Sequence, residues 1–141
     1  TTALDVTIQA QILDLMKEVL AQRRGSAILL ITHDLAVVAE TCHRVIVMYG
    51  GKIQEVAPVQ VLFEEPLHPY TQGLLRSIPN PENKGKKLHT IAGSVPSILE
   101  FPVGCKFANR CPAVFNRCHR EEPELRQVRS GHWVRCHLME E

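Results

Sequence analysis

A short run of consecutive apolar residues, Ala27–Ile31, places the strongest constraint on what this chain can fold into. A glycine and a serine precede the run, and His33 and Asp34 come soon after it. A continuous apolar run of this length between turn-forming residues is typical of a strand that is buried on both faces. The pattern therefore predicts a buried strand over residues 27–32, whose carboxyl end leads directly to His33.

Helical periodicity flanks this run on both sides. Apolar residues recur every three or four positions over residues 7–24, which predicts an amphipathic helix that ends at a glycine. A second stripe predicts a short helix over residues 34–42, with Asp34 as its N-cap. A strand between two such helices indicates an α/β fold, in which ligands bind at the carboxyl ends of strands. His33 is therefore a candidate site residue, although an isolated histidine here is also compatible with a solvated loop.

Two β-rich runs follow, over residues 45–49 and 52–56, and the pair Gly50-Gly51 joins them. Both central residues of a type I′ turn need positive φ, so this pattern predicts a tight antiparallel hairpin. After the hairpin, the sequence predicts a short helix over residues 59–63 and another that opens at His68-Pro69-Tyr70.

A polar, proline-containing stretch without periodicity, residues 79–87, predicts a linker between two units. Residues 1–78 form the first, α/β unit, and residues 88–141 form a second unit that contains four of the five cysteines. A chain of 141 residues can bury one modest core, or one core and a smaller second one.

The overall charge and hydropathy exclude several classes of protein. The formal net charge is +1, which gives no electrostatic reason to expect a nucleic-acid partner. No apolar run approaches the roughly 18 residues that a membrane span needs, and no N-terminal segment has the pattern of a secretion signal. The abrupt start, without an initiator methionine, suggests a piece of a longer chain.

Four cysteines gather in the second unit, at Cys105, Cys111, Cys118 and Cys136. Without a secretion signal, this usage points to a metal site or to reactive thiols rather than to a disulfide framework. A structural zinc site usually includes a close Cys-x-x-Cys pair, which is absent here. The wider gaps suit a cubane iron–sulfur cluster with four cysteine ligands.

Zinc, and free or oxidised thiols, remain the alternatives to an iron–sulfur cluster. In a zinc site, His119, His132 or His137 could replace a cysteine, but the simpler interpretation is that these histidines lie on the surface. Phe107 and Trp133 are expected to pack over the site and to exclude water from it.

The order of these motifs resembles the second half of the nucleotide-binding subunit of an ABC transporter. The motifs are Thr2-Ala3-Leu4-Asp5 before a helix, and then an apolar strand that ends at Thr32-His33-Asp34. The segment His68-Pro69-Tyr70-Thr71, followed by Leu74, Leu75 and Ile78-Pro79, resembles an extension of the peptide and nickel importer branch. The resemblance implies part of an ABC ATPase (P-loop NTPase-like) sheet with its helices, followed by a small cysteine-rich module.

The resemblance also implies roles for individual residues. His33 would contact the γ-phosphate of ATP, and Asp5 would belong to a loop that spans a dimer of nucleotide-binding subunits, unless it serves only as a helix N-cap. The four cysteines match a C-terminal segment that holds a four-iron four-sulfur cluster in some members. No Gly-x-x-x-x-Gly-Lys-Ser/Thr loop occurs in the chain, and the family's Walker B and signature motifs are also missing. We therefore expect ATP and Mg²⁺ to bind only in the intact parent, and this chain alone to be inactive.

The implied function is that of an ATP-binding subunit of a bacterial peptide importer, peripheral on the cytoplasmic face of the cell membrane. Its partners would be a second ATP-binding subunit, the transmembrane permease subunits and, indirectly, an extracytoplasmic substrate-binding protein. A nickel importer of the same branch and a stand-alone metal-binding or redox regulatory module are the competing interpretations. Because the strand over residues 27–32 expects neighbours, the fragment is also expected to self-associate.

Overall fold

The structure is a computed structural model, and it describes residues 6–23, 25–79 and 89–140. The chain divides into two compact units, Thr1–Thr41 and Cys42–Glu141. The predicted linker over residues 79–87 lies almost entirely outside the described residues. The domain boundary expected there therefore stays a prediction.

Two helices make up the regular structure of the first unit, α1 (Val6–Gln22) and α2 (Leu35–Thr41), as the periodicity predicts. Asp34 caps α2, because its Oδ1 accepts hydrogen bonds from the N–H groups of Ala36 at 2.9 Å and Val37 at 3.3 Å. This cap satisfies two donors that the helix itself leaves without partners. It also sets the direction in which the chain enters α2.

The buried strand predicted over residues 27–32 is wrong. This segment runs extended between α1 and α2 without strand pairing, and Leu29 and Ile31 are 81% and 88% exposed. A strand is stable when a neighbouring strand satisfies its backbone N–H and C=O groups. No other strand lies among the described residues of this unit, so the segment lacks the neighbours that its apolar pattern requires.

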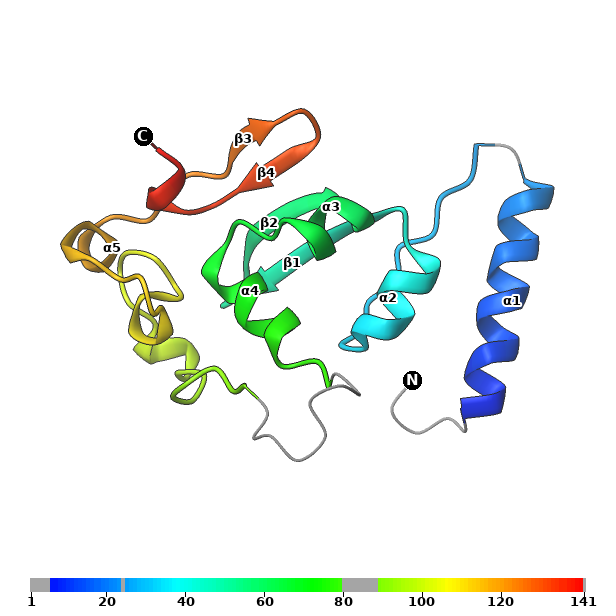
Figure 1. Cartoon of the computed structure of the whole chain (residues 1–141), viewed down its shortest axis with the longest axis horizontal. Coiled ribbons are helices and arrows are strands. Elements are labelled where there is room, and N and C mark those ends of the chain that lie inside the picture. Colours follow the sequence, from blue (N-terminus) through cyan, green and yellow to red (C-terminus); the bar gives the residue numbers. More distant parts are fainter. Residues whose placement is uncertain (1–5, 24, 80–88, 141) are drawn as a thin grey trace. The chain divides into compact units, whose positions relative to one another are not determined.

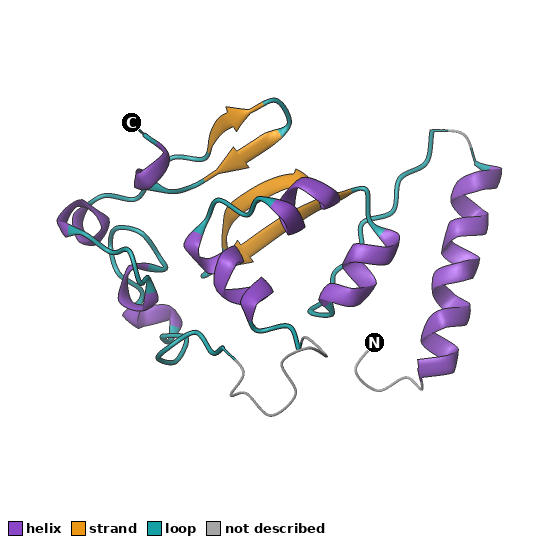
Figure 2. Ribbon diagram, in the orientation of Figure 1, coloured by secondary structure: helices purple, strands orange, loops and turns teal. Residues whose placement is uncertain are grey.

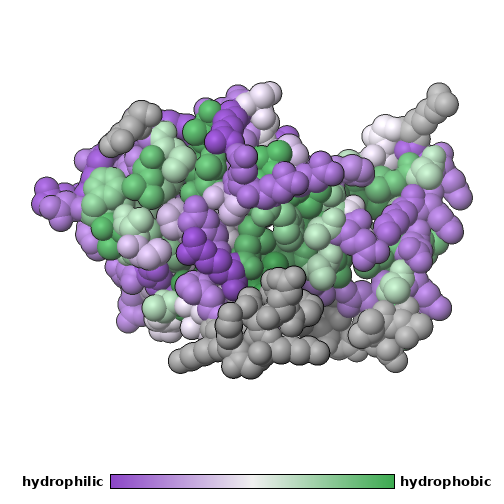
Figure 3. Space-filling view, in the orientation of Figure 1, coloured by the Kyte–Doolittle hydropathy of each residue, from purple (hydrophilic) through white to green (hydrophobic). Residues whose placement is uncertain are grey.

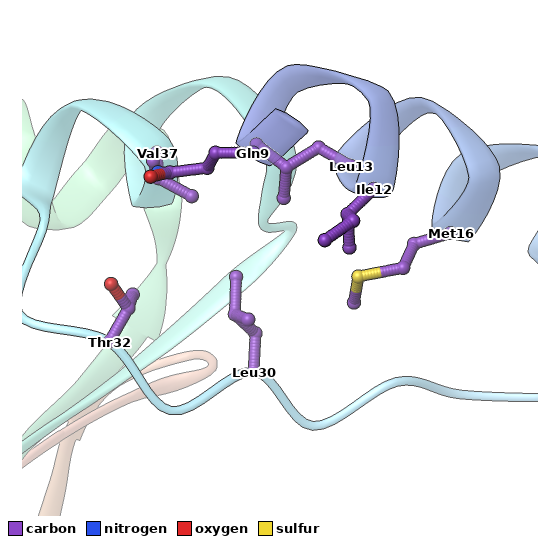
Figure 4. Close-up of a pocket in the computed structure, with 7 residues that line it drawn as sticks. All are labelled: Gln9, Ile12, Leu13, Met16, Leu30, Thr32 and Val37. Atoms are coloured by element: carbon purple, nitrogen blue, oxygen red, sulfur yellow. The ribbon is translucent and has the colours of Figure 1, made fainter. Parts of the chain in front are cut away.

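Leu30 and Thr32 are the members of this segment that face α1 and α2. Together with apolar side chains of both helices they surround a cavity of about 40 Å³ (Figure 4). The cavity is lined by Gln9, Ile12, Leu13, Met16, Leu30, Thr32 and Val37. This contact is the small core of the first unit.

A four-stranded sheet organises the second unit, with strands β1 (Arg44–Tyr49), β2 (Lys52–Pro58), β3 (Arg126–Arg129) and β4 (His132–Val134). The strand order is β1-β2-β4-β3, and every neighbouring pair is antiparallel (Figure 2). The sheet is therefore built from two hairpins that are distant in the sequence. The described structure is a mixed α/β arrangement with an antiparallel sheet.

The glycine pair between β1 and β2 makes the predicted hairpin. Gly50 and Gly51 have φ values of 57° and 74°, which a residue with a Cβ adopts only under strain. The two hairpins are joined through β2 and β4, where Glu55 pairs with Val134 and Val56 pairs with Trp133. Residues from the C-terminal part thus complete the sheet begun by the first hairpin.

Short helices cover one face of the first hairpin: α3 (Val59–Glu64) and α4 (Pro69–Arg76) (Figure 1). Leu62 of α3 packs on Val47 and Ala57 of the sheet, and Leu74 of α4 joins them. The C-terminal part adds α5 (Asn116–Arg120) and single turns of 3-10 helix at Ile98–Glu100, Ala108–Arg110 and His137–Met139. A second apolar cluster, around Tyr49 and Phe107, lies at the end of the hairpin.

Large apolar side chains remain exposed in both units, and Figure 3 shows apolar surface, coloured green, beside polar surface in the face it presents. Ile12 and Leu15 of α1 are 41% and 60% exposed, and Ile98 and Leu99 are 89% and 96% exposed. Among the described helices, none is both long enough and apolar enough to cross a membrane.

Candidate functional site

His33 lies in the turn that joins the extended segment to α2. Its side chain is exposed and makes no hydrogen bond with the residues that the structure describes, while the neighbouring Thr32 Oγ1 accepts a bond from Asp34 N at 3.1 Å. Asp5 lies outside the described residues. The nucleotide-contact and dimer roles expected for His33 and Asp5 therefore stay predictions.

The four C-terminal cysteines come together in space, although they are spread over three segments of the chain. Cys105, Cys118 and Cys136 are buried and Cys111 is half-buried, and none of the five cysteines, all in described parts of the chain, is in a disulfide. Burial raises the pKa of the Cys136 thiol to about 12, and the charges of Cys105, Cys111 and Cys118 add to this effect. The four thiols are therefore electrostatic neighbours, and we refer to them, together with the apolar residues packed against them, as the thiol pocket.

Backbone N–H groups are directed at several of these sulfur atoms. Burial raises the pKa of Cys105, while the N–H groups of Phe107 and Ala108 oppose this by favouring the thiolate. Two further cysteines have such a donor. The N–H of Ala113 favours the thiolate of Cys111, and the N–H of Leu138 favours the thiolate of Cys136. Hydrogen bonds to thiolate sulfur are among the features that tune metal–thiolate centres.

Within residues 6–23, 25–79 and 89–140, no group of three or more His, Cys, Asp or Glu side chains is arranged to hold a single metal ion. Zinc needs four ligands that converge on one point, and a cubane iron–sulfur cluster needs four thiolates. Both kinds of metal centre stay predictions for these four cysteines.

Phe107 forms the apolar wall of the pocket, as expected. It is 1% exposed and packs with Cys105, Cys118 and Tyr49, whose ring centroid lies 5.2 Å from its own. Trp133 does not belong to this cluster. It lies on β4 opposite Val56, and its expected packing over the cysteines stays a prediction.

Two of the three histidines expected on the surface are buried. His132 and His137 are 1% and 5% exposed, whereas His119 is exposed as predicted. Nε2 of His132 lies 2.7 Å from Oε1 of Glu55, a carboxylate that is 0% exposed. The pattern of β2 predicted a strand but did not identify Glu55 as buried, because its partner lies 77 residues away.

Glu55 also accepts two backbone hydrogen bonds, from the N–H groups of Leu67 at 2.8 Å and His68 at 3.1 Å. We refer to Glu55, Leu67, His68 and His132 as the Glu55 network. A buried carboxylate is stable when it is hydrogen-bonded in this way. The network joins β2, the start of α4 and β4.

His68 caps α4 from within this network. Its Nδ1 accepts a hydrogen bond from Tyr70 N at 3.0 Å, and Pro69 occupies the first position of the helix, where no N–H is needed. Burial lowers the pKa of His68 to about 4, against the opposing charge of Glu55. His68 is therefore neutral at physiological pH. The His-Pro-Tyr segment works as a buried helix start.

Three cations surround one carboxylate close to the thiols. Glu122 lies 3.0 Å from Lys52 and 3.6 Å from both Lys106 and Arg135. Burial raises the pKa of Glu122, but the three cations outweigh this effect and hold its pKa below the ordinary value. Lys106 follows Cys105 and Arg135 precedes Cys136 in the sequence, so two of these cations lie on cysteine-bearing segments.

Comparisons with known proteins agree with the resemblance found in the sequence. The family described as "Oligopeptide/dipeptide transporter, C-terminal region" matches residues 54–118. The oligopeptide transport ATP-binding protein AppD of Bacillus subtilis is 56% identical over 100% of this chain and 43% of its own length. The dipeptide transport ATP-binding protein DppD of Escherichia coli is 47% identical over 97% of this chain and 42% of its own. A putative peptide import ATP-binding protein of Brucella ovis is 50% identical over 96% and 42%. The chain thus spans less than half the length of these relatives.

Proposed function

Because residues 54–118 match the C-terminal region of the oligopeptide/dipeptide transporter family, we propose that this chain works as part of an ATP-binding subunit that powers peptide import. The observation that carries the proposal is the similarity to peptide-transport ATP-binding proteins along nearly the whole chain. The buried His68-Pro69-Tyr70 helix start lies within the matched region. The relatives are named as peptide-transport proteins, which favours peptides over nickel as cargo.

The partners proposed for the intact protein are a second ATP-binding subunit and the transmembrane permease subunits, at the cytoplasmic face of the bacterial membrane. A substrate-binding protein on the other side would deliver the cargo. The exposed apolar residues of segment 27–32 and of α1 support an assembly in which further chain covers them. In isolation, the same residues favour self-association of the fragment.

His33 is the residue that we propose to contact ATP, with Asp5 in the neighbouring subunit interface. In hydrolysis, water attacks the γ-phosphorus, the bond from that phosphorus to the β–γ bridging oxygen breaks, and ADP leaves. A neutral imidazole can donate one hydrogen bond to the γ-phosphate while its other nitrogen accepts one. The exposed position of His33 in the turn before α2 leaves its ring available for this contact.

Two measurements test this proposal. Calorimetry with MgATP should detect no tight binding to this chain, which contains no phosphate-binding loop. In a protein that joins these residues to such a loop, His33→Ala should lower ATP turnover roughly 10²–10³-fold, as loss of a charge-stabilising donor does. His43→Ala, at another exposed histidine, is the control and should leave turnover unchanged. Full turnover by His33→Ala would contradict the assignment.

A second proposal concerns the four thiols, which we propose as ligands of a four-iron four-sulfur cluster. The burial of three thiols and the N–H groups directed at sulfur support an anionic metal–thiolate centre. Such a cluster, when bound, would hold the C-terminal segments together. Cys105, Cys111, Cys118 and Cys136 would each bind one iron through sulfur.

Optical spectra of anaerobically purified protein, with iron, sulfide and zinc analysis of the same sample, test the cluster directly. Equal amounts of iron and sulfide, with broad thiolate-to-iron absorption, would support it. One zinc per chain would replace it with a structural zinc site. If neither metal is present and anaerobic reconstitution also fails, the cysteines act as thiols only.

A further inference from the structure

The Glu55 network lies between α4 and the thiol pocket. On one side, Glu55 holds the N–H groups of Leu67 and His68 directly before α4. On the other side it holds His132, and β4 then leads within four residues to Cys136. The buried carboxylate therefore contacts both the helix start and the strand that carries a thiol.

Backbone contacts continue this connection to the cysteine. Val134 is paired with Glu55 in the sheet, and the N–H of Arg135 donates to Gln54 O at 2.8 Å. The ring of His68 lies 5.9 Å from that of Phe107, which packs with the thiols of Cys105 and Cys118. Both His68 and His132 are thus connected to the thiol pocket through only a few residues.

The hydrogen bonds of the network depend on one another. Both oxygens of Glu55 are engaged, and the site is closed to water, so a lost donor has no replacement. Nδ1 of His68 already caps α4, and Nδ1 of His132 is buried without a partner among the described residues. When one donor moves away, the buried carboxylate keeps an uncompensated desolvation cost, which lowers the stability of the closed network as a whole and lets it open more readily.

We propose that Glu55 is a positioning residue that couples the helix α4 to the thiol site. When the thiols bind a ligand, α4 opens less often. When α4 opens, Cys136 becomes accessible to solvent. This inference rests on the thiol site proposed above and deepens it by naming the element that responds to its occupancy. Because coupling between two sites is reciprocal, it is measurable from either end.

Thiol labelling measures the coupling from the side of α4. The four cysteines fall in four different tryptic peptides, since at least one Lys or Arg separates each pair, so alkylation can be followed at each site. In Glu55→Gln, an amide replaces one acceptor oxygen by a donor that faces other donors. Alkylation of Cys136 and amide exchange over residues 72–76 should both accelerate, roughly tenfold or more.

Two control variants distinguish coupling from surface or general effects. Glu65→Gln makes the same substitution at an exposed carboxylate that pairs with Arg129, and it should change neither rate. Gly51→Ala destabilises the same unit through its positive φ, and its Cβ would meet no atom within 4 Å. If Gly51→Ala, at the same loss of unfolding free energy, releases Cys136 and α4 together as Glu55→Gln does, the proposal is overturned.

Anaerobic reconstitution measures the coupling from the side of the thiols. Iron and sulfide, followed by their thiolate-to-iron absorption, should bind the wild-type chain and slow amide exchange over residues 72–76. In Glu55→Gln they should still bind but no longer protect α4. Equal protection in both proteins overturns the coupling.

Further outcomes separate the two proposals. If iron and sulfide fail to bind the wild-type protein under anaerobic reconstitution, the thiol site is overturned, and the labelling comparison alone decides the role of Glu55. If Glu55→Gln does not fold, His132→Phe provides the same comparison. This variant leaves the carboxylate its two backbone donors.

Discussion

The backbone N–H of Cys105 donates to the carbonyl oxygen of Cys118 over 2.8 Å, and Gly104 makes this approach possible. A Cβ on Gly104 would overlap with the Cys118 oxygen and would lie 2.8 Å from the carbonyl carbon of His119. The neighbouring atoms are backbone, which cannot rotate away as a flexible side chain can. This contact brings together two cysteine-bearing segments whose spacing in the sequence gives no sign of the pairing.

Replacement of Gly104 by alanine should therefore lower the free energy of unfolding of the second unit by about 2–3 kcal/mol, the cost of overpacking a close contact. Urea unfolding followed by the fluorescence of Trp133, the one tryptophan in the chain, measures this change. Gly51→Ala is the control, because a Cβ there meets nothing within 4 Å. It should cost about 1 kcal/mol, from its positive φ alone. Equal effects of the two substitutions would contradict the steric explanation.

Stability should depend on pH through His68. Burial lowers its folded-state pKa to about 4, while the unfolded chain titrates near the ordinary value of about 6.5. The unfolded state therefore binds the proton first. The stabilising contribution is complete above about pH 6.5 and is lost as the pH falls toward about 4, by about 3 kcal/mol in total.

His68→Asn tests this assignment. The asparagine Oδ1 can still accept from Tyr70 N, so the cap is retained and only the titrating group is removed. Urea unfolding at several pH values between 4 and 7 should show a flatter dependence in the variant. An unchanged slope would mean that another group causes the loss of stability in acid.

The N-cap of α2 should control the order of the helix that follows His33. Asp34→Ala removes the acceptor of Ala36 N and Val37 N, at a cost of about 1 kcal/mol. Hydrogen exchange at these two amides should accelerate roughly fivefold. The control Asp14→Ala removes only a weak 3.9 Å surface contact with Lys17 and should have no effect there. Slow exchange in Asp34→Ala would show that packing alone orders α2.

Iron and sulfide binding should depend on the four clustered thiols and not on Cys42, which lies just beyond α2. After anaerobic reconstitution, Cys118→Ser should lose bound iron and sulfide, because Cys118 is buried in the cluster with Phe107 and Cys105. Cys42→Ser should retain both at wild-type levels. Loss in both variants would point to general unfolding, and retention in both would exclude Cys118 as a ligand.

Local sequence patterns predicted the elements whose stability depends on nearby residues. The periodicity of α1, the Asp34 cap and the glycine turn of the first hairpin all act over a few residues, and the structure contains each of them. The strand over residues 27–32 was also predicted from a local pattern, but a strand needs a partner from elsewhere. Its apolar pattern is typical of a strand with neighbouring strands, and the described residues of this unit include no such neighbour.

By itself, the sequence determined the family resemblance, the helices, the first hairpin and the candidate residues, because these depend on residue type and short-range order. Only the tertiary structure decided that β4 joins β2, that His132 is buried on Glu55, and that Gly104 brings Cys105 against Cys118. These contacts join residues far apart in the sequence. Their stability comes from desolvation and close packing, which no local pattern of polar and apolar residues specifies.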